Sequence, residues 1–286
     1  MALICAVWGS TWLVIKYGLR DIPPFTGASL RFFVAAAVMA LVARIWAKRE
    51  GGGRPPLSVI AAQGVFQFAL NYGLVYVGET VIPSGLVSVL WAVFPLFIGL
   101  AGHFVLKTER LRGPQWLGIA LALGGVALLF ATDLARVSAR AVPMGLLVLL
   151  APLSVTVSTL MIKQRAAGSS SLILNRDSML IGAVVLGACA FFCERGRALV
   201  FTPVAIAAVL YLALAGTVLT FGLYLWLLRY VPAYRLSLIS FVTPVVALLV
   251  GATIGGEPLG VHTLLGTALV LTGVGFTLLK GKPTVA

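Results

Sequence analysis

Ten stretches of mostly apolar residues alternate with short polar connections along this chain. They lie at residues 2–18, 25–47, 57–77, 82–106, 113–131, 143–162, 172–193, 203–228, 232–254 and 259–279. About 20 apolar residues suffice for a helix to cross a bilayer. Connections such as DIPP (21–24) and EPLG (257–260) leave no room for a soluble domain. The pattern predicts an all-α integral membrane protein with ten transmembrane helices.

Composition supports a lipid environment for the 286-residue chain. Hydrophobic residues make up 60% and charged residues only 10%, whereas a soluble domain has about 25% charged residues. The net charge is +13, but the basic residues form short clusters between apolar runs, which is typical of membrane topology signals. We therefore expect membrane lipid as a partner and no nucleic acid. No cleavable signal peptide is evident, and the first span is expected to start almost at residue 1.

Lysine and arginine are distributed unequally between alternate connections. If the N-terminus is cytoplasmic, the inner side holds most of them, among them Arg44, Lys48 and Arg49, and the outer side holds fewer, such as Arg195 and Arg197. The excess of positive charge inside predicts that both termini are cytoplasmic.

The two halves of the sequence resemble each other. A shift of 149 residues, which becomes 148 after a one-residue gap, aligns glycines, prolines and a Glu-x-Leu motif. The aligned pairs are Gly73 and Gly222, Pro83 and Pro232, Ser88 and Ser237, Pro95 and Pro244, Glu109 and Glu257, Gly118 and Gly266, and Gly125 and Gly273. This predicts two five-helix repeats, at 1–135 and 141–282. Because five is odd, the second repeat must enter the membrane inverted, as in many secondary transporters that bind substrate in a central cavity between the halves.

The paired prolines have two interpretations. Pro83 and Pro232 open their helices, where a missing N–H costs little. Pro95 and Pro244 fall in mid-helix and free a backbone carbonyl. They either form hinges that shape the cavity or are static kinks supported by neighbouring helices.

These features together resemble a known family. The WGSTW stretch at 8–12, the duplication, the mid-helix prolines and the Glu-x-Leu motifs are similar to those of EamA-type members of the drug/metabolite transporter superfamily. The chain looks most like the bacterial aromatic amino-acid and metabolite exporters. The resemblance implies a carrier in the bacterial inner membrane that exports its substrate by alternating access.

Polar and aromatic residues within the predicted spans are the candidates for the substrate site. They are Trp8, Ser10, Trp12, Asn71, Tyr72, Tyr76, Ser88, Trp91, Ser158, Tyr224, Ser237, Ser240 and Thr243. Rings provide large contact areas, and hydroxyls and an amide could bind an ammonium and a carboxylate, so a zwitterionic amino acid is the expected substrate. The alternatives are interfacial aromatic residues and hydroxyls that bond only to their own helix.

Charged residues bear on the other possibilities. Efflux of multiple drugs or lipophilic cations is the alternative function. The first span has no acidic residue, unlike the small multidrug carriers of the superfamily, and this favours amino-acid export over that alternative. Arg31 and Arg176 are expected to extend to the interface, Lys16 is expected to be interfacial, and Glu109 and Glu257 are expected to cap helices or anchor loops. No carboxylate is assigned to the middle of a span, so proton-coupled and facilitated export both stay open.

An enzyme or a channel is less consistent with the sequence. His103 and His262 are the two histidines, and no metal-binding, Walker or nucleophile motif is present. We expect no catalytic residues, no metal and no cofactor. Cys5, Cys189 and Cys193 are expected to be small core residues. Small residues in the fifth and tenth spans could mediate dimerisation, but we expect them to pack helices within a monomer.

Overall fold

The protein is all-helical wherever its structure is described. The computed structural model describes residues 1–106, 111–134, 138–230 and 239–278. Within these ranges the regular elements are helices, and the extended pairing is an isolated bridge between Gly53 and Ser169.

The described helices follow one another in chain order, first in the N-terminal half and then in the C-terminal half. The first half contains α1 (Ala2–Gly18), α2 (Pro24–Glu50), α3 (Leu57–Ala62), η1 (Gln63–Leu70), α4 (Asn71–Glu79), α5 (Ser84–Trp91), α6 (Phe94–Ala101), η2 (Gly102–Leu106), α7 (Gly113–Leu129) and η3 (Phe130–Leu134). The second half contains α9 (Ala141–Arg165), α10 (Ser171–Cys193), α11 (Pro203–Ala213), η4 (Leu214–Leu219), α12 (Thr220–Tyr230), α14 (Ile239–Thr253) and α15 (Val261–Thr277). The η segments are π-helical turns within longer helices.

Seven helical stretches of the described chain are long and apolar enough to cross a membrane. They are 24–50, 57–79, 84–106, 113–133, 141–165, 171–193 and 203–224. The shorter apolar helices α1, α14 and α15 coincide with the predicted first, ninth and tenth spans.

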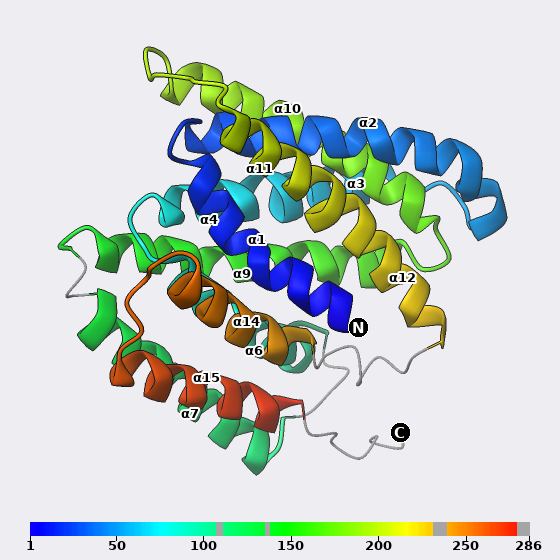
Figure 1. The fold of residues 1–286 in the computed structure, drawn as a ribbon. Helices are drawn as coiled ribbons and strands as arrows, with labels where there is room; N and C mark the ends of the chain where they lie inside the picture. Colours follow the sequence, from blue (N-terminus) through cyan, green and yellow to red (C-terminus); the bar gives the residue numbers. More distant parts are fainter. Residues whose placement is uncertain (107–110, 135–137, 231–238, 279–286) are drawn as a thin grey trace.

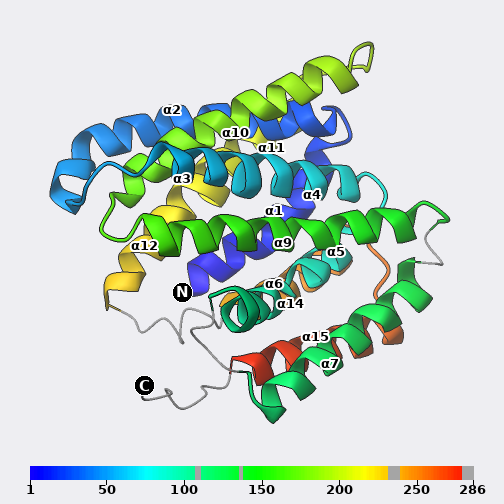
Figure 2. The ribbon, with the colours of Figure 1, turned by 180° about the vertical axis from the view of Figure 1, so that it is seen from behind.

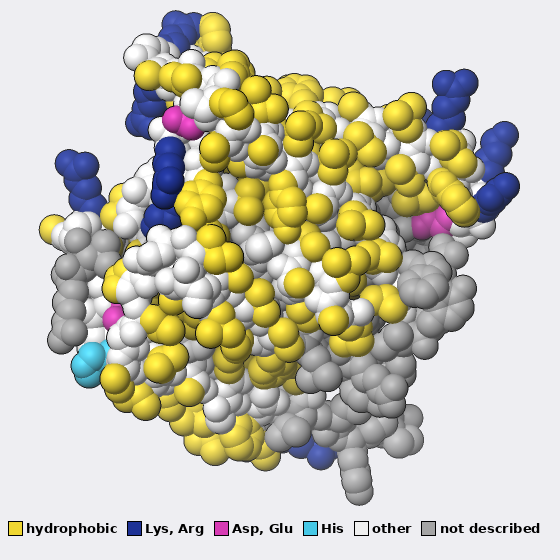
Figure 3. All heavy atoms as spheres, viewed as in Figure 1, with side chains coloured by type: hydrophobic (Ala, Val, Ile, Leu, Met, Phe, Trp, Pro, Cys, Tyr) yellow, Lys and Arg dark blue, Asp and Glu magenta, His cyan; other side chains and the backbone are white. Residues whose placement is uncertain are grey.

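The molecular surface has the character of a membrane protein. Figure 3 shows Lys and Arg side chains gathered at opposite edges, with a broad hydrophobic face between them. Large apolar residues such as Leu41, Leu180 and Leu264 are more than half or nearly half exposed, at 63%, 49% and 52%. Monomeric soluble proteins rarely expose apolar surface on this scale, so these residues form a lipid-facing belt.

Helices from the two halves pack side by side. The helix α2 lies along α10 at one side of the molecule, and α7 lies along α15 at the opposite side (Figures 1 and 2). Between these pairs, α1 packs against α14 and α11, and α9 packs against α4 and α6. The helix α5 also contacts α14. The core is therefore built largely from contacts between the halves.

Glycines permit the close crossing of α7 and α15. A Cβ added at Gly118 would lie 2.6 Å from the carbonyl oxygen of Gly273, and one at Gly125 would lie 2.7 Å from that of Gly266. The backbones therefore touch where these glycines meet. The small residues of these helices pack within one chain, as expected from the sequence.

The prolines have different local effects. Pro83 precedes α5 as its N-cap residue. The helix is interrupted at Ala92 and Val93, and Pro95 lies in the first turn of α6. Pro244 lies inside the continuous helix α14, and Pro152 inside α9. Pro232 lies outside the described residues.

The cysteines are only partly as expected. Cys5 is buried, Cys189 is intermediate and Cys193 is exposed. The prediction of a core position was therefore wrong for Cys193, which comes last in α10, where the helix reaches the molecular edge.

Replacing Gly125 by alanine should destabilise the protein. The new Cβ would clash with the Gly266 carbonyl oxygen and would lie 2.8 Å from the Val270 nitrogen. Overpacking of this kind costs about 1–3 kcal/mol. Thermal unfolding of the purified protein in detergent micelles measures the effect.

Gly124→Ala is the matched control. A Cβ at Gly124 meets nothing within 4 Å, and alanine is the better helix former, so this variant should be at least as stable as the parent. Equal unfolding temperatures for the two variants would contradict the close crossing.

Candidate functional site

Predicted site residues from three helices meet in a first aromatic cluster. The ring centroids of Trp12 in α1 and Trp91 in α5 are 6.4 Å apart. The indole Nε1 of Trp91 donates to Oδ1 of Asn71 in α4 at 2.8 Å. The Asn71 amide in turn donates to the Gln67 carbonyl, which orients it toward the indole. The indole nitrogen of Trp12 is buried and has no partner.

A second cluster joins α1 to the eighth predicted span. Trp8 lies 5.9 Å, centroid to centroid, from both Tyr224 and Phe221 in α12. The hydroxyls of Ser10 and Tyr211 are 2.7 Å apart. The α1 helix therefore carries aromatic contacts to both sequence halves from neighbouring turns.

The tyrosines of α4 lie in a different environment. The ring of Tyr72 packs against Phe32 at 4.8 Å and lies below the guanidinium of Arg31 at 4.5 Å. Tyr76 is 3% exposed, and its hydroxyl has no hydrogen-bond partner. Both rings face the protein interior and not a lipid interface.

Two of the remaining predicted residues bond within their own helices, and the buried Ser158 hydroxyl has no partner. Ser88 donates to the Gly85 carbonyl and Thr243 to the Ile239 carbonyl. Ser158 is buried, and Ser240 is partly buried. Ser237 lies outside the described residues.

The expectation that Arg31 reaches the interface was wrong. Its side chain is 1% exposed, and its Nε donates to Thr217 Oγ1 at 3.1 Å. A second donor reaches the Gly216 carbonyl at 3.5 Å, and both acceptors belong to η4. The guanidinium is thus held by a π-helical turn from the other half, whereas Arg176 is 36% exposed and pairs with Asp177.

Glu79 was not identified as a candidate from the sequence. It ends α4, is 1% exposed, and neither carboxylate oxygen has a hydrogen-bond partner. Residues three and four apart share a helix face, so Glu79 continues the row of Tyr72 and Tyr76. That spacing was the signal available in the sequence.

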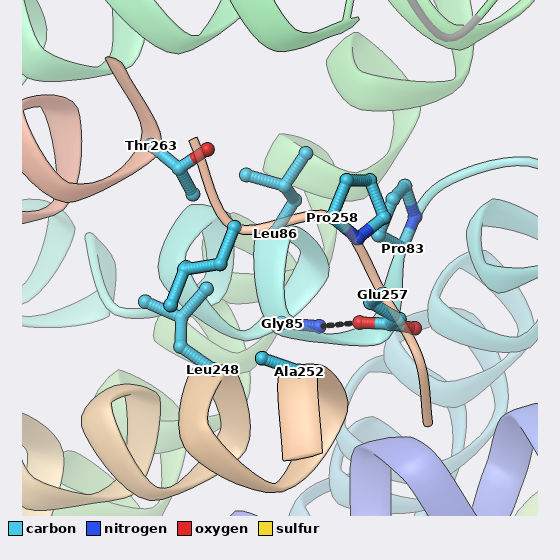
Figure 4. Close-up of a pocket in the computed structure, with 9 residues that line it drawn as sticks. Pro83, Gly85, Leu86, Leu248, Ala252, Glu257, Pro258 and Thr263 are labelled. Atoms are coloured by element: carbon cyan, nitrogen blue, oxygen red, sulfur yellow. Dashed lines mark hydrogen bonds between the residues drawn. The ribbon is translucent and has the colours of Figure 1, made fainter. Parts of the chain in front are cut away.

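Glu257 caps a helix, as predicted. Its carboxylate accepts hydrogen bonds from the backbone N–H groups of Ser84 at 2.7 Å and Gly85 at 3.1 Å, the first residues of α5. Figure 4 shows the bond from Gly85. Lys16 Nζ lies 3.5 Å from the same carboxylate. Exposed N–H groups and the dipole at a helix start favour a negative charge. Glu109 lies outside the described residues.

Two further carboxylates cap helices of the opposite half. Glu194, just after α10, accepts from the N–H groups of Phe25 at 2.7 Å and Thr26 at 2.9 Å at the start of α2. Glu50, at the end of α2, accepts from the Ser170 hydroxyl at 2.6 Å and the Leu172 N–H at 3.2 Å at the start of α10. The antiparallel pair α2 and α10 is therefore capped reciprocally.

Two pockets lie near the end of α1 and the start of α5. One is about 250 Å³ and is lined by Leu13, Lys16, Tyr17, Leu19, Arg20, Glu79, Thr80, Gly255 and Glu257. The other, of about 10 Å³, lies between Pro83, Leu248 and Pro258 (Figure 4). Neither is lined by the predicted tryptophans.

Fold and surface define a protein of the membrane: helices with a lipid-facing belt enclose aromatic and polar side chains. The chain belongs to the EamA-like transporter family, whose model matches residues 1–131 and 143–279. It is thus a multi-pass membrane protein.

Several relatives match nearly the whole chain. The "Uncharacterized inner membrane transporter YedA" of Escherichia coli (strain K12) is 30% identical, with 98% of this chain and 91% of the relative covered. A "Probable amino-acid metabolite efflux pump" of the same strain is also 30% identical, with coverage of 95% and 91%. A solved structure matches with a TM-score of 0.65 at 18% identity, covering 96% of this chain and 94% of that chain, which supports the fold alone.

Replacing Glu257 by alanine should lower the unfolding temperature. Two N–H groups and the Lys16 ammonium would lose their acceptor, and hydrogen bonds to charged groups contribute about 1.5–3 kcal/mol each. Thermal unfolding in detergent is again the measurement.

The control is Asp177→Ala. Its carboxylate is 23% exposed and pairs with the adjacent Arg176, and pairs of this exposed kind contribute about 0–1 kcal/mol. A Glu257→Ala variant as stable as the control would show that the cap adds nothing.

Proposed function

We propose that this protein is a secondary transporter that exports small amphipathic metabolites, amino acids including aromatic ones, by alternating access. The observation that carries the proposal is the meeting of Trp12, Trp91 and Asn71, together with the contact of Trp8 with Tyr224 from the other half. Such rings tolerate varied side chains, and the amide and hydroxyls provide polar contacts. The relative named as an amino-acid metabolite efflux pump supports the substrate class.

The proposed architecture is ten transmembrane helices in two inverted repeats, 1–135 and 141–282, around a central cavity. The helix neighbours support it. If the first five spans correspond to the last five, the contacts of α1 with α14 and α11 correspond to those of α9 with α6 and α3. The pairs α2–α10 and α7–α15 each join equivalent helices.

Local irregularities support the same repeat. Shifted back by 149 residues, the π-helical turn η4 falls within η1. The caps from Glu50 and Glu194 are reciprocal between the equivalent helices α10 and α2. The family model also matches the chain in two segments.

In the proposed mechanism, helices bend at internal positions while hydrogen bonds hold their first residues in place. The carboxylate caps hold the starts of α2, α5 and α10, while the α5–α6 break before Pro95 and the proline inside α14, Pro244, provide places to flex. Movement there would expose the aromatic clusters to alternate sides of the membrane. In this proposal the protein is a monomer in the bacterial inner membrane with both termini cytoplasmic.

Alanine at Trp12, Tyr76 or Trp91 should impair transport without preventing folding. We expect the initial rate of labelled amino-acid counterflow in proteoliposomes to fall about tenfold or more, which corresponds to about 1.4 kcal/mol. The substrate panel should include aromatic and aliphatic amino acids and a lipophilic cation.

Trp46→Ala is the matched control, because Trp46 in α2 is 51% exposed and belongs to neither aromatic cluster. Wild-type rates in all three site variants would remove these residues from the site. Counterflow of the cation alone would replace the amino acid as the substrate class, and transport without saturation or counterflow would indicate a channel.

A further inference from the structure

Glu79 is a buried carboxyl group that the fold does not pair. It is 1% exposed, and neither oxygen has a hydrogen-bond partner. Three carboxylates near helix ends, those of Glu50, Glu194 and Glu257, each accept several hydrogen bonds. Glu79 therefore does not serve as a helix cap, and its location calls for another explanation.

An ionised carboxylate is costly in this environment. Removing a charge from water without partners is so unfavourable that such a group takes up a proton instead. Ionisable residues inside membrane spans are expensive and mark ion or proton pathways. The neutral carboxylic acid is the form that fits the described conformation.

Glu79 also lies beside a pocket from which a proton could arrive, with both carboxylate oxygens buried behind its wall. Glu79 lines the 250 Å³ pocket together with Lys16 and Glu257. Lys16 is 32% exposed, pairs with Glu257 at 3.5 Å and donates to the Ile82 carbonyl at 3.0 Å. The Lys16 ammonium thus already has a carboxylate partner while Glu79 has none.

Several charged and titratable groups surround Glu79. The fields of Lys16 from α1, Glu257 from the α14–α15 connection and Arg31 from α2 reach its carboxyl. Arg20 lines the same pocket, and Tyr76 lies one turn earlier in α4. Loss of the proton from Glu79 would place a second negative charge beside Glu257, and the two carboxylates would compete for one ammonium.

We propose that Glu79 is the proton-binding site that couples transport to the proton gradient. This inference rests on the proposed function, which supplies the identity of the transported substrate. A proton from water in the pocket forms an O–H bond with the carboxylate, and the same bond breaks when the proton returns to water. The buried, unpaired position favours the protonated form and a more open position favours the ionised form, so protonation shifts the balance between conformations.

Glu79→Gln tests the coupling, because glutamine mimics the neutral acid but cannot release a proton. In proteoliposomes, wild type should accumulate labelled phenylalanine under an imposed pH gradient, up to about tenfold per pH unit for one proton per substrate. Glu79→Gln should retain counterflow and lose accumulation. Asp177→Asn, which removes a partly exposed carboxylate elsewhere, should accumulate like wild type.

Three results would overturn the proposal. They are accumulation by Glu79→Gln equal to wild type, counterflow by wild type without pH-driven accumulation, and accumulation driven by a sodium gradient instead. If the Glu79→Gln variant does not fold, the Lys16→Met variant is tested in its place. Loss of the ammonium that stabilises the ionised carboxylate should move the pH profile of accumulation to higher pH, and an unmoved profile would also contradict the proposal.

An infrared measurement separates this inference from the choice of substrate. The purified protein should show a carboxylic-acid C=O band that disappears as pH rises, and this band should be absent from Glu79→Gln but present in Asp177→Asn. A band unchanged by Glu79→Gln would overturn the assignment of the proton to Glu79. If no amino acid in the panel is transported while the band behaves as expected, the proposed substrate fails and the proton site stands.

Discussion

The structure depends on one constraint: inside a bilayer, backbone polar groups and charges at helix ends must find partners within the protein. Carboxylates meet this need at three helix starts. Glu194 caps α2, Glu50 caps α10 and Glu257 caps α5. Each cap comes from the other half of the chain, so the bonds that complete the helices also hold the halves together.

The packing of the helices distinguishes closely packed crossings from interrupted helices that could flex. The glycine-mediated crossing of α7 and α15 is rigid because the two backbones touch. The break at Ala92 and Val93 and the π-helical turns η1 and η4 lie away from the caps, within their helices. Interruptions of this kind often occur at functional sites. In the proposed mechanism, flexing at the break between α5 and α6 exposes the aromatic clusters around α1.

Much of the fold could be predicted from the sequence, because its main signals are local. Apolar length placed the helices, and the repeated Glu-x-Leu motif identified the cap by Glu257. The environments of Arg31 and Glu79 could not be predicted, because they depend on distant contacts. Thr217, which holds Arg31, lies 186 residues away in sequence. Position alone indicated an interface for Arg31, whereas tertiary packing buried both residues.

The opposite orientation of the two halves is the central claim, and accessibility of single cysteines tests it most directly. Arg54→Cys and Arg197→Cys are made in a background without Cys5, Cys189 and Cys193, and intact cells are treated with a membrane-impermeant thiol reagent. Both positions are exposed and follow equivalent helices of the two proposed repeats. The account predicts labelling of the cysteine at 197 in intact cells and labelling of that at 54 only after permeabilisation. Labelling of both positions from the same face would contradict it.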